Sequence, residues 1–91
     1  MNMWLASKSR ESVDKAIAHL SATMPDRITD AGGDAHFALW LYAADRHIIA
    51  ALGVGCRDLP DQNWRERYEA DISPAQAASD ALAQWRANGD L

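Results

Sequence analysis

The chain has 91 residues, of which 48% are hydrophobic and 24% are charged, and its net charge is −4. This length excludes two independent cores, and the apolar fraction excludes an intrinsically disordered chain, so we expect a single small domain over 1–91. The negative charge disfavours binding of the whole molecule to nucleic acid or to anionic lipid, and it favours a protein partner with a basic surface.

Cysteine content and the N-terminal sequence indicate a reducing compartment. The single Cys56 excludes an internal disulfide. The first residues lack a basic segment followed by an apolar run, so no signal peptide is predicted. The most apolar stretch, 37–52, is interrupted by Asp45, Arg46 and His47, which disfavours a membrane span. We therefore expect a cytoplasmic protein.

An apolar stripe at helical spacing predicts the first long helix, over roughly 9–24. Ser9 is the expected N-cap, and Glu11 and Lys15 form a favourable pair one turn apart. Pro25 is expected to end the helix. For the preceding segment, 2–6, a short strand and a packed arm both remain open. The stripe consists of Val13, Ala16, Ile17, Leu20 and Met24.

The segment 25–34 is rich in turn formers and is expected to be a loop, with a brief strand at 27–29 as an alternative. Asp34 then caps a second long helix that reaches Leu52, and Gly53 or Gly55 ends it. The main apolar stripe of this helix consists of Phe37, Trp40, Leu41, Ala44, Ile48, Ala51 and Leu52.

This second helix also carries an apolar row outside its main stripe, formed by Leu39, Tyr42 and Ile49. A helix that is apolar on more than one side is either central in its domain or shared with another chain. We expect these three side chains to be exposed and to form a partner interface. The carboxylates expected to complement a basic partner are Asp26, Asp30 and Asp34.

Two further helices are predicted in the second half of the chain. Asp58 and Asp61 are expected to cap a short helix that ends near Ala70, and Ser73 with Pro74 begins the last helix. Gly89 is expected to close it. The fold predicted is therefore all-α: a compact bundle of about four helices with a short N-terminal strand or arm. Its expected structural anchors are Trp40, Trp64, Tyr68, Trp85, Ser73 and Pro74.

Residues able to carry out catalysis or bind metal are few and poorly spaced. His19, His36 and His47 belong to no zinc-binding or metalloprotease motif. We expect no metal, no cofactor and no enzymatic activity. Asp45 with Arg46 and His47 is more consistent with a solvated helix side than with an acid–base pair. Cys56 is expected to be a packed residue.

The second half of the chain resembles a group of small phage- and plasmid-encoded proteins without an assigned function. The similarity lies within 45–82, and no catalytic residue or cofactor is carried over. It implies a mobile genetic element as the genomic setting. The residues that carry it are Asp45-Arg46, Asp58-Leu59-Pro60-Asp61, Trp64-Arg65, Tyr68, Ser73-Pro74, Ala77-Ala78 and Ala81-Leu82.

Three functional hypotheses follow. The first is a non-enzymatic interaction protein of a mobile element that blocks a host defence complex, in the manner of anti-CRISPR proteins. The second is a homodimeric structural or regulatory protein that pairs through the extra apolar row. The third is a small hydrolase that uses His36 or His47 with an acidic residue.

Overall fold

The computed structural model describes residues 2–53 and 63–87, and these residues form six helices and no strand. The predicted all-α class is therefore confirmed, whereas the predicted number of about four helices is too low. None of the helices in the described ranges is both long and apolar enough to cross a membrane. The helices are α1 (Met3–Ala6), α2 (Arg10–Thr23), α3 (Pro25–Asp30), α4 (Ala35–Leu52), α5 (Trp64–Glu69) and α6 (Pro74–Ala87).

The caps predicted for the two long helices of the first half are confirmed. The Ser9 side chain accepts a hydrogen bond from the backbone N–H of Ser12, and Asp34 does the same for Phe37. Gly53 ends α4 with a φ of 77°, which a glycine adopts without steric cost. Local sequence signals therefore fix both ends of α4.

Two short helices account for the difference in number. The segment 2–6 is not a strand, because Asn2 caps the single turn of α1, and it packs on the domain through the buried residues Asn2 and Leu5, as the alternative of a packed arm expected. The segment 25–30 is α3 rather than a loop or strand, since Pro25 occupies the first helical turn, where its missing N–H costs nothing. The N–H of Gly33 donates to the carbonyl of Ile28 and closes α3.

In the second half, Ser73 caps α6 through the N–H of Gln76, as predicted, and Pro74 occupies the first turn. Helix α5 begins at Trp64, with Asn63 as its cap. The predicted caps Asp58 and Asp61, like the predicted terminator Gly89, lie outside the described residues.

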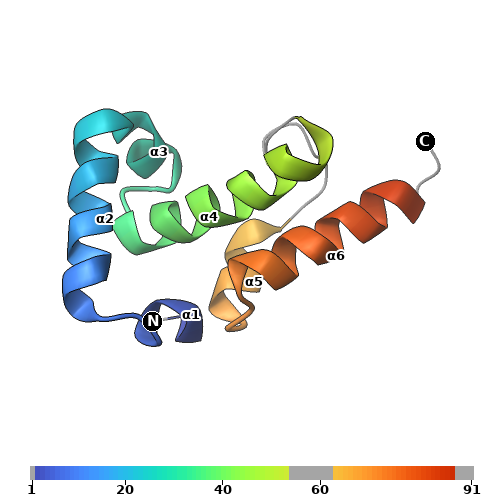
Figure 1. Ribbon diagram of the computed structural model, residues 1–91, viewed down its shortest axis with the longest axis horizontal. Helices are drawn as coiled ribbons and strands as arrows, with labels where there is room; N and C mark the ends of the chain where they lie inside the picture. The colour runs from blue at the N-terminus through green and yellow to red at the C-terminus, as the bar shows by residue number, and fades with distance from the viewer. Residues whose placement is uncertain (1, 54–62, 88–91) are drawn as a thin grey trace.

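Helix α4 is the centre of the molecule. It packs most extensively against α6, while α2 and α3 cover its N-terminal half and α5 lies below it (Figure 1). Trp40 is fully buried, as are Ala44 and Ile48 one and two turns further along the helix. The facing residues of α6, Ala77, Ala78 and Ala81, are small, which allows the two helix backbones to approach closely.

Four aromatic rings from α4 and α5 form the main side-chain cluster. The ring centroids of Phe37 and Tyr68 lie 5.0 Å apart, and Trp40 packs edge-on against Tyr68 at 5.8 Å and against Trp64 at 6.3 Å. Such offset and edge-on arrangements are the favoured ones for aromatic pairs. Three of the predicted anchors, Trp40, Trp64 and Tyr68, thus contact one another in this cluster, and Trp85 is partly buried against the same core.

A buried asparagine joins the N-terminus to the turn between α5 and α6. The Nδ2 of Asn2 donates to the carbonyls of Tyr68 at 2.9 Å and Ile72 at 3.0 Å, while its Oδ1 accepts from the N–H of Trp4. The Ile72 carbonyl also accepts from the indole Nε1 of Trp40 at 2.9 Å. The Asn2 side chain is 2% exposed, so three hydrogen bonds compensate the burial of its amide.

The same turn is held in an unusual backbone conformation. Asp71 has a φ of 64°, in the left-handed region that glycine normally occupies after a helix. The N–H of Ile72 donates to the Arg67 carbonyl and completes a helix-ending motif. The Asp71 carboxylate accepts from the N–H of Met3, so its side chain contributes a contact that glycine lacks.

We expect Asn2→Ala to lower the free energy of unfolding by about 2–3 kcal/mol, because it removes a helix cap and two donors to carbonyls in the turn. Asn2→Asp keeps the capping oxygen but turns a carboxylate toward those carbonyls, so it should lower the free energy of unfolding at least as much as Asn2→Ala. Ser9→Ala, which removes only an exposed cap, should cost about 1 kcal/mol. Urea denaturation followed by circular dichroism measures all three, and equal losses for Asn2→Ala and Ser9→Ala would contradict the role given to Asn2.

Candidate protein-binding groove

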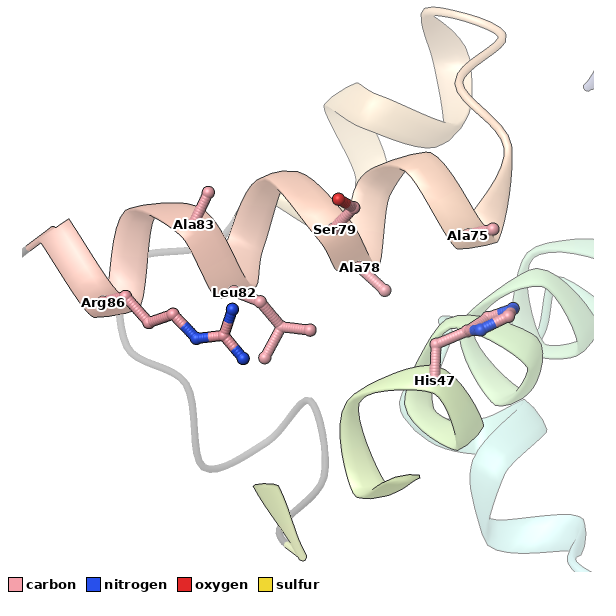
Figure 2. A pocket seen from close by; sticks show the side chains of 7 residues that line it. All are labelled: His47, Ala75, Ala78, Ser79, Leu82, Ala83 and Arg86. Carbon is pink, nitrogen blue, oxygen red and sulfur yellow. The ribbon is translucent and has the colours of Figure 1, made fainter. Parts of the chain in front are cut away.

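A groove of about 280 Å³ lies between the C-terminal half of α4 and the outer side of α6. Figure 2 shows Leu82 and Arg86 extending from α6 toward the space beside α4, with His47 on the facing helix. The other lining residues are small and follow helical spacing along α6. The groove is lined by His47, Ala75, Ala78, Ser79, Leu82, Ala83 and Arg86.

The groove lies near the last buried residues of α4 and α6. The buried residues of α6 end at Ala81, while Leu82 and Trp85 are only partly buried. On α4, Ile48 is the last buried residue, and Ile49 is 45% exposed. The far ends of both helices therefore leave apolar side chains open to solvent.

The only two acidic residues that α4 and α6 contain are both engaged away from the groove. The Asp45 carboxylate lies 3.3 Å from the guanidinium of Arg27, and the Asp80 carboxylate lies 3.4 Å from that of Arg67. Asp80 also accepts a hydrogen bond from the side chain of Gln76. No carboxylate is among the described lining residues, whereas Arg86 is, and within the described ranges it has no acidic partner.

The predicted apolar interface is corrected by the structure. Leu39 is 9% exposed and belongs to the core, so the expectation that it is exposed is wrong. Tyr42 is partly buried, and its ring lies under the guanidinium groups of Arg27 at 5.1 Å and Arg46 at 6.0 Å. Only Ile49 of the three is exposed. The extra apolar row is mainly used by the fold, because α2, α3 and α6 surround the first half of α4.

Of the predicted acidic set, Asp34 is engaged within the molecule. Its carboxylate caps α4 and lies 3.0 Å from the guanidinium of Arg65, which also bonds Glu69. Asp26 and Asp30 occupy exposed positions on α3. The acidic contribution of these three residues to a partner interface stays a prediction.

The structure separates the residues considered for catalysis. Asp45 is 7% exposed, so its predicted place on the solvated side of α4 is wrong, whereas Arg46 and His47 are exposed. The burial of Asp45 is explained by its ion pair with Arg27. Within the described ranges, no three potential ligands gather as a metal site. Cys56 lies outside those ranges.

Two pKa shifts occur beside Arg65, away from the groove. Burial raises the pKa of Asp34, but the hydrogen bond from the Phe37 amide and the interactions with Arg65 outweigh it, and the net pKa is lowered. Burial, aided by the nearby charge of Asp34, raises the pKa of Tyr68. The Arg65 guanidinium lies over the rings of Phe37 at 4.9 Å and Tyr68 at 5.6 Å. These groups stabilise the junction of α4 and α5.

Comparisons of the chain with protein-family models, curated proteins and solved structures find no match. The interpretation of the groove therefore depends on its own residues. Sequence analysis did not single out Ser79 or Arg86, although their spacing places them on one side of the last predicted helix. The missing information was how much of that side α4 covers.

We expect Asp34→Asn to lower the free energy of unfolding at pH 7 by about 1 kcal/mol, because asparagine still caps a helix but cannot form the ion pair. The folded-state pKa of Asp34 lies below its ordinary value of 3.8, so the stabilisation is present above that value and is lost as the pH falls through the folded-state pKa. Urea denaturation from pH 7 to pH 3 should show the wild type and the variant converging. The stability loss caused by Asp34→Asn should be smaller in an Arg65→Gln background. A loss that is independent of both pH and Arg65 would contradict the ion pair as its cause.

Proposed function

We propose that the chain is a non-enzymatic protein-binding module that receives a segment of a partner protein in the groove between α4 and α6. The observation that carries the proposal is the groove itself, an open depression lined mainly by small and aliphatic side chains. Among its lining residues, Ala75 and Ala83 are exposed and Leu82 is partly buried. Exposed apolar side chains in an open groove are typical of protein interaction sites.

The openness of the groove favours side chains of a protein over a small-molecule cofactor. Ligand pockets usually enclose about 300–1,000 Å³ and bury most of their ligand. The groove, at about 280 Å³, lies near the lower limit of this range but is open to solvent. One or two aliphatic side chains of a partner fit such a volume, with the partner's remaining contacts made along the rims of α4 and α6.

The contacts of Asp45 weigh against the hydrolase alternative. A general base must lie within hydrogen-bond reach of the group it deprotonates and must be oriented toward it. The Asp45 carboxylate is instead paired with Arg27 of α3, while His47 lines the groove. A carboxylate–imidazole pair at this site is therefore disfavoured.

The finer proposal, a mobile-element protein that blocks a host defence complex, is supported by the resemblance within 45–82. Blocking a larger complex requires only a stable surface and no chemistry of its own, which is compatible with a small helical domain. The genes beside this one in its natural setting test this part directly. A locus without any mobile-element gene would contradict it.

We expect a photo-crosslinking amino acid at Ser79 to capture a partner in the cells that naturally express the chain, because Ser79 lines the groove. The same amino acid at Ser21, an exposed position on α2, is the matched control. Mass spectrometry identifies the crosslinked proteins. The proposal predicts a species captured from Ser79, absent from Ser21 and lost when Ala83→Trp fills the groove.

Three results would contradict the proposal. Identical crosslinks from Ser79 and Ser21 would indicate nonspecific contact, and no crosslink from Ser79 would indicate an unused groove. Capture of a second copy, together with a dimer mass in light scattering, would favour the homodimer alternative.

A further inference from the structure

The charges around the groove differ in sign from the charge of the chain. The whole molecule carries −4, but the carboxylates of α4 and α6 are compensated by Arg27 and Arg67 on other elements. Among the described residues that line the groove, the charged side chain is Arg86, and His47 lies on the facing helix. Binding is directed by the charges that face a partner rather than by the net charge.

The geometry points to an acidic segment of a foreign protein as the occupant of the groove: an aliphatic side chain against Leu82 and Ala83, and a carboxylate at Arg86. This inference rests on the proposed function and specifies its partner. Arginine binds a carboxylate through two parallel hydrogen bonds, which gives direction as well as attraction. In Figure 2 the Arg86 side chain lies next to Leu82, so both contacts fall within a short segment of a partner.

A second copy of the chain fits the groove less well. A two-fold contact centred on the groove brings the same surface of both copies together, and with it the arginines of both copies. Like charges across an interface are unfavourable, most of all where water is excluded. The groove therefore favours a partner with a complementary charge over self-association.

Nucleic acid is also disfavoured as the occupant, although it is anionic. A phosphate backbone is attracted by many cations together, and the overall charge of −4 repels it. In the part of the chain that the structure describes, the groove offers Ala75, Leu82 and Ala83 beside one arginine, which suits an aliphatic side chain better than a sugar–phosphate chain.

A random 16-residue peptide library displayed on phage tests the inference. Selection uses the folded wild-type chain, after binders to the groove-filled Ser79→Trp variant have been removed. Ser79 and Arg86 occupy exposed positions, so the Ser79→Trp variant and the Arg86 variants described below should fold. We expect the surviving peptides to combine an aliphatic residue with an adjacent Asp or Glu.

Charge-reversal variants then test whether Arg86 binds the carboxylate of the selected peptides. Arg86→Glu should weaken the selected peptides at least tenfold in fluorescence anisotropy, and replacing the peptide carboxylate by lysine should restore binding to that variant. Arg86→Gln should give an intermediate loss. Arg10→Glu, which changes an exposed arginine of α2, is the matched control and should leave binding within twofold.

The outcomes separate this inference from the proposed function. Groove-specific peptides that are neutral or basic, or whose binding does not depend on Arg86, would overturn the inference of an acidic partner. They would still support the proposed function, a protein-binding groove. Absence of any groove-specific peptide would count against both. Single-stranded DNA that binds the wild type and is released by Arg86→Glu would also overturn the inference, in favour of a nucleic-acid ligand.

Discussion

The arrangement of the helices depends on how the backbone carbonyls of the turn between α5 and α6 are satisfied. Asn2 donates to the carbonyls of Tyr68 and Ile72, and Trp40 donates to that of Ile72. Three segments that are distant in the sequence thus meet at one turn. A buried polar group without a partner is costly, so this set of hydrogen bonds fixes α1, α4 and the start of α6 together, in a way that nondirectional apolar packing does not.

The groove lies along α6, the helix that begins at that turn. Helix α6 starts at the satisfied turn and packs through Ala77, Ala78 and Ala81 against the middle of α4. The aromatic rings of α4 and α5 gather near the same end, whereas on the later turns of the two long helices Ile49 is exposed and Leu82 and Trp85 are only partly buried. A domain of this size has little apolar surface with which to cover every helix along its length. The surface it leaves open includes the groove, whose lining on α6 runs from Ala75, near the anchored turn, to Arg86.

Much of the local structure was predictable from the sequence, and the errors share a physical cause. Ser9, Asp34 and Ser73 cap helices because the signal and its effect lie within four residues. The role of Asn2 and the burial of Asp45 depend on Tyr68 and Arg27, partners that are remote in the sequence. Leu39 was placed at the surface because periodicity identifies apolar sides of a helix but not the number of neighbours that cover them. The groove was missed for the same reason.

A tertiary contact can change which charges of a sequence segment are exposed, as the segment 45–47 shows. Asp45-Arg46-His47 contains one acid and one arginine, and taken by itself it gives no net charge. In the folded chain Arg27 withdraws Asp45 from the surface, and Arg46 and His47 remain exposed. Asp80 is compensated by Arg67 in the same manner. An acidic protein can therefore expose cationic side chains at one place on its surface, so its total charge alone does not give the sign of the charge at each site.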